Sequence, residues 1–454
     1  MDMPTSFKAY DVRGRVDDDL DEHLAHNLGV ALVNQINARR VVVGRDIRAS
    51  SPMLLDALAD GIQAAGTDVI DIGLCGTEEV YFATDHFATD AGVMVTASHN
   101  PIDYNGFKMV GRGAAPVPQD TFRQIGAATA KGDAGVNSSR GARRAMSCRD
   151  AYVEKVCSFV EPDHMRALHI LVNAGNGCAG PAFDAIFDIL CAKGAPLRAT
   201  RLHHDPDPTF PNGIPNPLLP ENQPTTSNAV LQNGADFGIA WDGDFDRCFF
   251  FDEKGDFIAG EYIVGILAAA ILTQHPGAHI VHDPRIIWNT QRLVTQAGGH
   301  AVMSKTGHAF LKASMRAENA VYGGEMSAHH YFRDFMFCDS GMIPWVLMLA
   351  WLSNDVTSLK HVVDDMRARH PSSGEINFRV EDPQAAIAAI HTAYADKAET
   401  VDWLDGLSMA FEGWRFNLRA SNTEPLLRLN VEAVRDAHLM QGRTNDIAEM
   451  IQAL

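Results

Sequence analysis

The chain has 454 residues, of which 46% are apolar and 21% are charged, a composition typical of a globular protein with roughly three or four domains. Its formal net charge of −19 argues against a nucleic-acid partner, because phosphate backbones need clustered Lys and Arg. Its seven cysteines include no C-x-x-C pair, which argues against both a disulfide framework and a zinc site.

Strand-like and helix-like stretches alternate over the first three-quarters of the chain, which is typical of α/β domains with mixed sheets. In chain order we expect strand 41–44, helix 51–65, strand 68–72, a helix from residue 78, strand 92–97, strand 169–173, helix 181–190, strand 237–241, a helix around residue 263, strand 279–282, a helix near residue 289 and strand 320–322. From Ser373 the pattern changes to strand 375–380, helix 383–394, strand material over 406–432 and a closing helix 438–454. This last part is expected to be a smaller α+β domain.

These elements predict four domains, at residues 1–147, 148–252, 253–369 and 370–454. The segment 131–144, rich in Gly, Ala, Ser and Arg, is expected to be a linker or an exposed excursion. Ligands of α/β domains bind on the loops that follow the carboxyl ends of the strands. The most polar loops, 96–101, 242–247 and 323–330, stand at such places, one in each α/β unit, so we expect them to share one site.

Three aspartates dominate the second of these loops. Asp242, Asp244 and Asp246 alternate after an apolar strand, and in extended backbone such residues point to one face. Three converging carboxylates need a cation, and oxygen ligands favour Mg²⁺, Ca²⁺ or Mn²⁺. An acidic surface turn is one alternative, and a calcium EF-hand loop is another. The EF-hand pattern has Glu253 at its last position but Arg247 where its turn needs Gly, so we favour a catalytic divalent cation.

Ser98 is the candidate nucleophile of the first loop. It follows an apolar strand, and His99 and Lys108 lie close in sequence, where they could supply proton transfer and positive charge. The alternative is a polar turn that merely ends the strand. A phosphoserine beside three carboxylates and a divalent cation leaves a site charge of about −3. Arg247, Lys108 and Arg13 are candidate cations that would offset it.

The remaining loops carry groups suited to binding a phosphorylated sugar. Arg419 opens a loop with hydroxyl and amide side chains that could wrap phosphate oxygens, although a plain polar hairpin turn is the alternative. Glu325, Ser327 and His329 alternate onto one face, where they could bind sugar hydroxyls, whereas His330 is expected to be structural. Arg285 and His308 also follow strands and are weaker candidates for binding.

These motifs together resemble the α-D-phosphohexomutase family, most of all its bacterial phosphomannomutase branch. The resemblance covers essentially the whole chain and rests on 7–14, the serine loop 96–101, the metal loop 242–247, the sugar loop 324–327 and the phosphate loop 419–423. It implies three related α/β domains with mixed sheets, plus a smaller C-terminal α+β domain, around a central cleft. It also implies interconversion of mannose 1-phosphate and mannose 6-phosphate through phospho-Ser98 and a hexose 1,6-bisphosphate, with glucose phosphates as further substrates.

The resemblance assigns roles residue by residue. It implies one Mg²⁺ held by Asp242, Asp244, Asp246 and an oxygen of Ser98, and a hexose 1,6-bisphosphate as primer. Arg247 would bind the transferring group, and Lys108 and His99 are the acid–base candidates. The substrate-binding residues would be Tyr10, Arg13, Arg285, His308, Glu325, Ser327, His329, Arg419, Ser421, Asn422 and Thr423. Arg285 stands where the family pattern has a lysine, so binding is its only expected role.

The expected partner is a hexose phosphate, and the expected assembly is a monomer or a small homo-oligomer. The start of the chain lacks the segments of a signal peptide, and the most apolar runs, 262–272 and 342–352, are too short for membrane helices. We therefore expect a cytoplasmic protein with no membrane partner. Two other hypotheses remain open: a metal-dependent sugar phosphatase, which would release inorganic phosphate, and a non-catalytic sensor, which would bind sugar phosphate without turnover.

Overall fold

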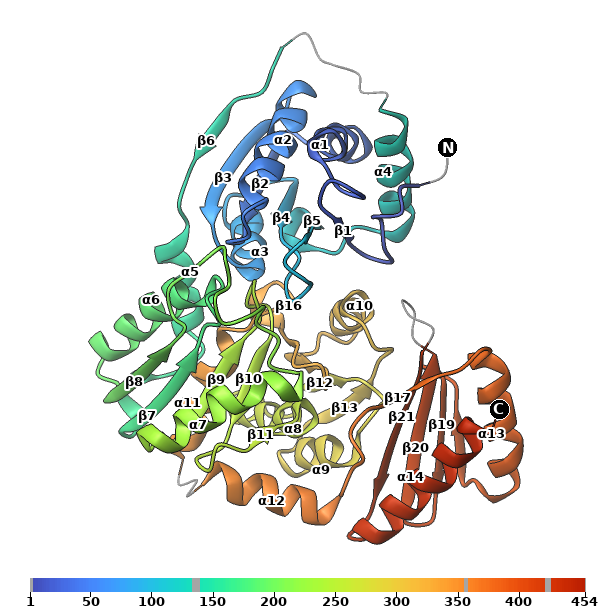
Figure 1. Ribbon diagram of the computed structural model, residues 1–454. Coiled ribbons are helices and arrows are strands. Elements are labelled where there is room, and N and C mark those ends of the chain that lie inside the picture. Colours follow the sequence, from blue (N-terminus) through green and yellow to red (C-terminus); the bar gives the residue numbers. More distant parts are fainter. Residues whose placement is uncertain (1–2, 133–138, 355–357, 421–425, 454) are drawn as a thin grey trace. The chain divides into compact units, whose positions relative to one another are not determined.

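The computed structural model describes residues 3–132, 139–354, 358–420 and 426–453. Two compact units make up the chain. Figure 1 labels their helices and strands. Unit 1 comprises Met1–Phe257 and Asp334–Asp355, and unit 2 comprises Ile258–Arg333 and Val356–Leu454. Within the described residues, no helix combines the length and the apolar character that a membrane span requires.

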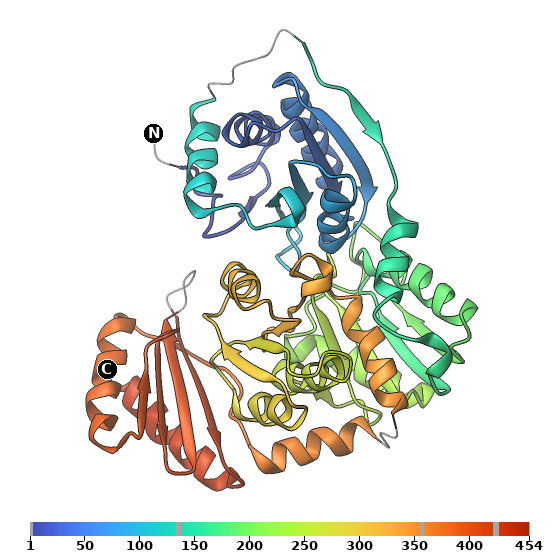
Figure 2. The ribbon, with the colours of Figure 1, turned by 180° about the vertical axis from the view of Figure 1, so that it is seen from behind.

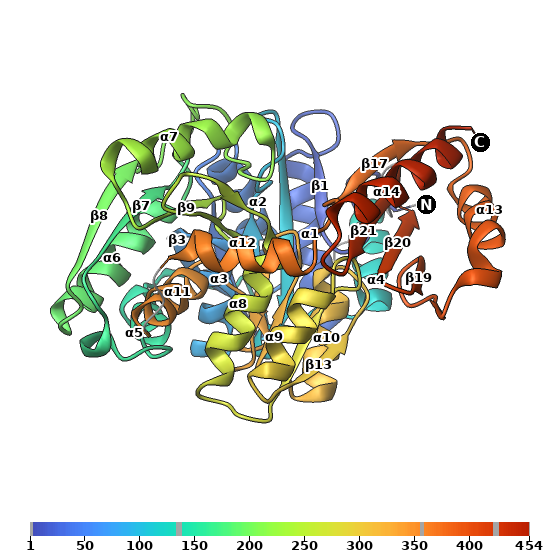
Figure 3. The same ribbon diagram turned by 90° about the horizontal axis from the view of Figure 1, so that it is seen from below.

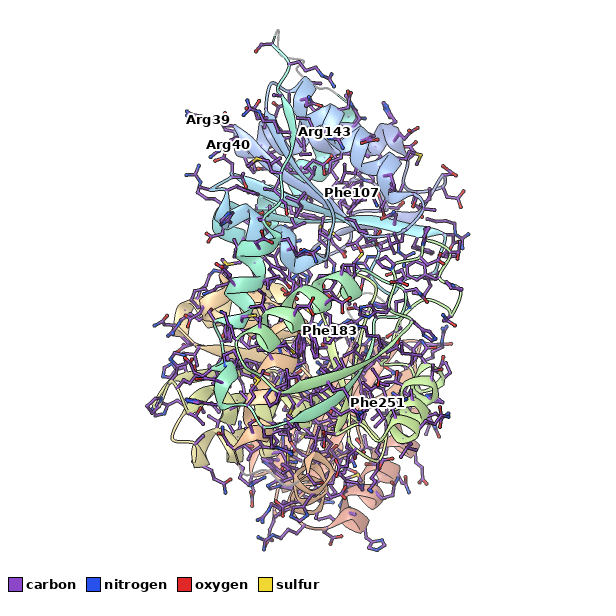
Figure 4. The ribbon with its side chains drawn as sticks, turned by 90° about the vertical axis from the view of Figure 1, so that its left-hand side faces the viewer. Arg39, Arg40, Phe107, Arg143, Phe183 and Phe251 are labelled. Atoms are coloured by element: carbon purple, nitrogen blue, oxygen red, sulfur yellow. The ribbon has the colours of Figure 1, made fainter. Side chains whose placement is uncertain are left out.

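The first sheet of unit 1 has the strand order β1-β5-β4-β2-β3-β6, in which β4, β2, β3 and β6 are parallel and β5 is antiparallel to both neighbours. The strands are β1 (Val12–Arg15), β2 (Arg40–Arg45), β3 (Asp68–Leu74), β4 (Ala91–Val95), β5 (Tyr104–Gly111) and β6 (Arg143–Ala145). The helices are α1 (Glu22–Ile36), α2 (Ser51–Ala64), α3 (Thr77–His86), η1 (Arg112–Ala114) and α4 (Gln119–Lys131). One apolar core joins α1, α2 and α4 to the sheet and includes Phe107 (Figure 4), whereas α3 packs on β2 and β4 outside this core.

The second sheet of unit 1 has the order β11-β10-β9-β7-β8, with β7 parallel to β8 and β9, and β10 antiparallel to β9. Its strands are β7 (Leu168–Asn173), β8 (Leu197–Leu202), β9 (Phe237–Trp241), β10 (Cys248–Phe251) and β11 (Phe257–Ile258). The other elements are α5 (Arg149–Cys157), η2 (Pro162–His164), α6 (Ala179–Ala192), η3 (Pro220–Asn222), α7 (Gln223–Asn233), β16 (Cys338–Asp339) and α11 (Ile343–Ser353). Phe183 of α6 (Figure 4) lies with its ring centroid 5.9 Å from that of Trp241 and 5.1 Å from that of Trp345, so α11 completes this core.

The first sheet of unit 2 contains the order β13-β12-β14-β15, with β12 parallel to β13 and β14, and β15 antiparallel to β14 (Figure 2). These strands are β12 (His279–His282), β13 (His300–Met303), β14 (Tyr322–Gly324) and β15 (His330–Phe332), followed by η4 (Arg333–Phe335). The helices are α8 (Gly260–Leu272), α9 (Trp288–Gln296), α10 (His308–Glu318) and α12 (Leu359–Arg369). A parallel centre with one antiparallel strand thus recurs in all three α/β sheets.

The second sheet of unit 2 is antiparallel, with the order β17-β21-β20-β19-β18. Its strands are β17 (Ile376–Arg379), β18 (Thr400–Asp402), β19 (Leu407–Phe411), β20 (Trp414–Ala420) and β21 (Leu426–Ala433). The helical elements are α13 (Pro383–Tyr394), η5 (Ala395–Lys397) and α14 (Ala437–Gln452). Both long helices pack on one face of the sheet and share its apolar core, so this part is an α+β domain (Figure 3).

Most expected elements are found close to their predicted bounds. Strands 237–241 and 279–282 and helix 383–394 have the predicted ends, and the apolar runs 262–272 and 342–352 are buried helices as expected. The sequence analysis did not predict β1 or β5. In the segment 131–144, expected to be a linker, the last residues enter the exposed strand β6.

Candidate active site

The three carboxylates of the acidic loop, the segment 242–247 also called the metal loop, lie together in unit 1. Asp242, Asp244 and Asp246 are buried, and each offers an oxygen within 4.8 Å of the others. Burial raises the pKa of Asp242 to about 6, because a buried anion loses its hydration. Oδ1 of Asp244 is buried and has no hydrogen-bond partner among the residues that the structure describes. Hard oxygen donors in one buried cluster, with one oxygen unused, fit a divalent cation such as Mg²⁺.

A tight turn, rather than extended backbone, brings these carboxylates together. The amide of Phe245 donates to the carbonyl of Asp242 at 3.2 Å, and Phe245 has φ 46°. The sequence analysis therefore predicted the aspartate cluster correctly, but its assumption of extended backbone was wrong. At Gly243 a Cβ would lie 2.7 Å from the carbonyl oxygen of Ser98, so this position requires glycine for the acidic loop to approach the serine loop.

Ser98 points its hydroxyl at this cluster. It follows β4 and adopts φ 50°, a left-handed conformation that is unfavourable for residues other than glycine. The hydroxyl is buried and donates to Oδ2 of Asp242 at 2.6 Å, while Nδ1 of His99 lies 3.0 Å from the same Oγ. A hydroxyl has one proton, so the shorter contact to Asp242 takes it in this arrangement.

Arg247 contacts both groups that lie beside the hydroxyl of Ser98, namely Asp242 and His99. Its Nε and Nη2 donate to Oδ2 of Asp242 at 3.0 and 2.8 Å, and Nη2 also donates to Nδ1 of His99 at 2.5 Å. The nearby charge of Arg247, together with burial, holds the pKa of His99 well below its usual range. His99 is therefore neutral, and its Nδ1 accepts a hydrogen bond from Arg247.

Lys108 of β5 provides the second cation of the cluster. Its Nζ donates to Oδ2 of Asp244 at 2.7 Å and also contacts Oδ2 of Asp246. Although burial opposes the charge, the two carboxylates raise the pKa of Lys108 above its usual range. Lys108 is therefore protonated here, so it offers positive charge and a proton. Together, Ser98, His99, Lys108, Arg247 and the three aspartates form what we call the transfer cluster.

Two arginines hold the serine loop in place. Arg48, which is buried, donates to the carbonyl oxygens of Ser98 at 2.9 Å, Asn100 at 2.5 Å, Pro101 at 2.7 Å and Tyr104 at 3.1 Å. Arg13 donates to the carbonyl of Ala97 at 3.2 Å and to the side chain of Asn100. The sequence analysis missed Arg48, although it follows the carboxyl end of β2 and so obeys the rule that located the other loops.

The sugar loop of unit 2 also forms a compact polar group. Glu325 is buried, and its carboxylate accepts from the amide of Gly307 at 2.8 Å and from the hydroxyl of Tyr331 at 2.6 Å. Nδ1 of His329 lies 3.8 Å from Oε2 of Glu325 and 3.2 Å from Oγ of Ser327. The structure thus brings together the three residues that alternate in the sequence.

A cluster of arginines surrounds one carboxylate elsewhere in unit 2. Oxygens of Glu375 lie 3.2 Å from Arg285, 3.4 Å from Arg419 and 3.3 Å from Arg428. Burial opposes the charge of Glu375, but these three cations hold its pKa below its usual range. Arg419 and Arg428 are direct cross-strand partners on β20 and β21, where like charges repel. Such a set of guanidinium groups suits a phosphate.

Arg285 is positioned by the strand end that precedes it. Its guanidinium and its backbone amide both donate to the carboxylate of Asp283, at 2.7 and 3.0 Å. Asp283 also accepts from the amide of Met326 at 2.8 Å, so one carboxylate ties Arg285 to the sugar loop. The carbonyl of Arg285 accepts from Arg415, which pairs with buried Glu432 at 2.7 Å.

The remaining predicted binding residues are Tyr10, His308 and three residues of the phosphate loop. Tyr10 is half-buried in the turn before β1, and His308 is half-buried at the first residue of α10. His308 directly follows Gly307, whose amide contacts Glu325. Three predicted phosphate-loop residues lie outside the described residues: Ser421, Asn422 and Thr423.

Comparison with known proteins gives full-length matches. Phosphoglucomutase/phosphomannomutase family models match as α/β/α domain I over residues 4–135, domain II over 150–255, domain III over 259–369 and the C-terminal domain over 375–450. The chain is 54% identical to a phosphomannomutase of Salmonella montevideo and 53% identical to phosphohexose mutases of Xanthomonas campestris pv. campestris, with 100% of both chains covered in each case. A solved phosphoglucomutase/phosphomannomutase family protein of Burkholderia thailandensis superimposes with a TM-score of 0.89 at 32% identity, covering 100% of this chain and 98% of the other.

The fold and these matches define the chain as an isomerase of the intramolecular phosphotransferase class. It belongs to the phosphoglucomutase/phosphomannomutase family. The predicted family is thereby confirmed, and so are the three α/β domains with mixed sheets and the smaller C-terminal α+β domain.

Proposed function

We propose that the chain interconverts mannose 1-phosphate and mannose 6-phosphate, and also acts on glucose phosphates, through phospho-Ser98 and a hexose 1,6-bisphosphate. The observation that carries this proposal is the buried hydroxyl of Ser98, 2.6 Å from a carboxylate of a three-aspartate cluster and flanked by Arg247 and Lys108. Full-length identity of 54% to a phosphomannomutase supports the choice of mannose.

The transfer cluster suits the exchange of a phosphoryl group. The P–O bond to Ser98 breaks as a new P–O bond forms to the free sugar hydroxyl, and the hydroxyl proton passes to a base. His99, beside Oγ of Ser98, and Lys108 are the proposed acid–base groups. The raised pKa of Lys108 keeps it charged, so it also offsets negative charge at the site. Arg247 offers the planar, permanently charged fork that binds phosphoryl oxygens.

A divalent cation fits the acidic loop. Asp242, Asp244 and Asp246, with an oxygen of phospho-Ser98, would hold one Mg²⁺, and the partnerless buried Oδ1 of Asp244 is a donor oxygen of the kind such an ion takes. When bound, Mg²⁺ would stabilise negative charge on the phosphoryl oxygens. Hexose 1,6-bisphosphate is the proposed primer, because it can phosphorylate Ser98 before the first turnover.

The polar groups of unit 2 are proposed to recognise the same substrate. Glu325, Ser327 and His329 offer acceptors and donors for sugar hydroxyls, and Arg285 and Arg419 offer guanidinium groups for the distal phosphate. Tyr10, Arg13 and His308 complete the proposed binding set together with residues 421–423. Domain bounds of 1–147, 148–252, 253–369 and 370–454 are part of the proposal and are supported by the grouping of the strands into four sheets.

Turnover of mannose 1-phosphate tests the proposal. The purified chain would receive Mg²⁺ and a trace of hexose 1,6-bisphosphate, and the appearance of mannose 6-phosphate would be measured beside glucose 1-phosphate and the Ser98→Ala variant. We expect turnover of both sugars by the wild type and none by the variant. Absence of turnover by the primed wild type would exclude these substrates.

The same assay separates the competing hypotheses. Release of inorganic phosphate without mannose 6-phosphate would indicate a phosphatase. Binding of sugar phosphate without chemical change would indicate a sensor. A Ser98→Ala variant with full turnover would remove Ser98 as the nucleophile while leaving the reaction itself intact.

A further inference from the structure

The first turn of α3 contacts the acidic loop at Asp244. The hydroxyl of Thr77 donates to Oδ2 of Asp244 at 2.5 Å, and the amide of Thr77 donates to the carbonyl of the same residue at 3.1 Å. Lys108 donates to that Oδ2 as well, whereas Oδ1 has no hydrogen-bond partner in the described part of the chain. With two donors on Oδ2 and one on its carbonyl, Asp244 has little freedom to rotate, and its unused oxygen is the one left for a ligand.

Neighbouring residues of the same turn fix Thr77 in place. The carboxylate of Glu79 accepts from the amide of Gly76 at 3.0 Å and pairs with Arg149 at 2.8 Å. Glu78 accepts from the hydroxyls of Tyr152 at 2.6 Å and Ser340 at 2.8 Å. Both glutamates are buried, so the start of α3 is held by donors from distant segments of unit 1.

The acidic loop also meets α3 by direct packing. At Gly76 a Cβ would lie 2.2 Å from the ring of Phe245, so only glycine lets the loop come this close. This contact places the hydroxyl of Thr77 within reach of Asp244 across a separation of 167 residues in the sequence. The pairing is thus a built feature of the fold and not an accidental surface contact.

We infer that Thr77 is a positioning residue for the divalent cation: its hydroxyl sets the orientation of the Asp244 carboxylate so that Oδ1 faces the aspartate cluster. This inference rests on the proposed function, in which the cluster binds Mg²⁺. Groups that hydrogen-bond to metal ligands fix the ligand's orientation, and their removal typically weakens metal binding by about 10–100-fold. Neither the acidic loop nor the serine loop contains Thr77, so no motif of the sequence analysis includes it.

Direct measurement of Mn²⁺ binding tests the inference without substrate. Mn²⁺ stands in for Mg²⁺, and the electron paramagnetic resonance signal of free Mn²⁺ would give its dissociation constant for the full chain. Thr77→Val and Thr77→Ala remove the hydroxyl, and Thr77→Ser keeps it. Thr84→Val is the matched control, because Thr84 is a buried threonine of the same helix whose hydroxyl donates only within the helix, to the carbonyl of Val80 at 2.7 Å.

We expect the dissociation constant to rise by about 10–100-fold in the hydroxyl-free Thr77 variants and to be close to the wild-type value in Thr77→Ser and Thr84→Val. Near-ultraviolet circular dichroism would establish that each variant is folded, and either hydroxyl-free variant suffices if the other does not fold. Wild-type affinity in a folded hydroxyl-free variant would overturn the inference. A wild-type chain that binds no Mn²⁺ would instead overturn the proposed metal site, so the two failures are distinguishable.

Discussion

The serine loop is held mainly by one guanidinium group. Arg48 donates to three backbone carbonyls of this loop, one of them that of Ser98, and to the carbonyl of Tyr104 in β5, and its charge is balanced by Asp46, 3.5 Å away. Ser98 adopts a left-handed conformation, which persists only where surrounding contacts over-determine it. Arg48 therefore helps to determine where the proposed nucleophile stands, although it does not touch Asp242 or the other carboxylates of the metal loop in any described contact.

Arg48→Lys should slow catalysis while retaining the fold. A lysine ammonium is a compact donor and cannot reproduce the planar fork that spans four carbonyls. Small displacements of a reacting group cost roughly 10²-fold in rate, so we expect kcat to fall by about that factor with little change in KM. Steady-state kinetics with mannose 1-phosphate would measure both. The control is Arg45→Lys, because Arg45 donates to the carbonyl of Asp46 and not to the serine loop; an unchanged kcat in Arg48→Lys would contradict the argument.

Glu325 offers a second test at the residue scale. Removal of its carboxylate in Glu325→Ala should raise KM for sugar phosphate, but the structure predicts a further cost. The half-buried amide of Gly307 and the buried hydroxyl of Tyr331 would lose their acceptor, at about 1–3 kcal/mol for the buried hydroxyl.

Glu325→Gln separates these two effects because it keeps the size of the side chain and one acceptor oxygen. We expect Glu325→Gln to raise KM with a urea unfolding midpoint near that of the wild type, whereas Glu325→Ala lowers the midpoint as well. Kinetics and urea unfolding on the same samples would check this. Wild-type KM in both variants would remove Glu325 from the binding site.

The hairpin of β14 and β15 carries a pH-sensitive pair. His330 is buried, and its Nδ1 lies 2.7 Å from the hydroxyl of Tyr322. No described residue offers a hydrogen-bond partner to its Nε2. Burial lowers the pKa of His330 from the usual 6.5 to about 3. The unfolded chain therefore binds a proton between pH 6.5 and pH 3 that the folded chain does not, so the folded state loses stability as the pH falls through this window.

His330→Phe should weaken this pH dependence, because phenylalanine keeps an aromatic ring beside Tyr322 and cannot be protonated. We expect the wild type to lose more stability than the variant between pH 7.5 and pH 5, by up to roughly 2 kcal/mol, given about 1.4 kcal/mol per pH unit below pH 6.5. Urea unfolding at both pH values would measure the difference. Equal losses in the two proteins would show that His330 does not titrate on unfolding.

Element prediction worked where one physical signal dominated. β9 is a continuous apolar run, β12 has the apolar pair Ile280 and Val281 at its centre, and α13 begins at Pro383 after the capping carboxylate of Asp382, so their bounds could be predicted. By contrast, β5 escaped prediction because its sequence mixes glycine, asparagine and Lys108 with apolar residues. Lys108 contacts the aspartates and not the apolar core. Its position in the strand interrupts the alternation of apolar and polar residues that marks a strand.

At the scale of the whole molecule, the cores are built from segments far apart in the sequence. The segment Asp334–Asp355 belongs to unit 1, where Trp345 lies against Phe183 of α6. The amide and hydroxyl groups before α11 also satisfy the buried carboxylate of Glu78. Apolar periodicity identifies α11 as a buried helix but does not say which core it enters.

Phe183→Ala should destabilise unit 1 selectively. Phe183 is fully buried against Phe187, Trp241 and Trp345, and truncation of such a residue costs about 3–5 kcal/mol. We expect faster amide hydrogen exchange in peptides of β7, α6 and α11, with exchange in β19–β21 unchanged. Hydrogen-exchange mass spectrometry of the full chain would measure both regions. Equal acceleration in β19–β21 would show that the two units unfold together.

The sequence by itself determined the polar loops, many of the strands and helices, and the family, because these depend on local composition and on the places where apolar runs end. It identified Ser98, the three aspartates, Arg247 and Lys108 as candidates, and the structure groups them. Tertiary structure alone decided which residues hold these groups in place, with Arg48 on the serine loop and Thr77 on Asp244. It also placed Glu375 among three arginines. Those contacts join residues far apart in the chain, and a buried donor's partner depends on packing that local sequence does not encode.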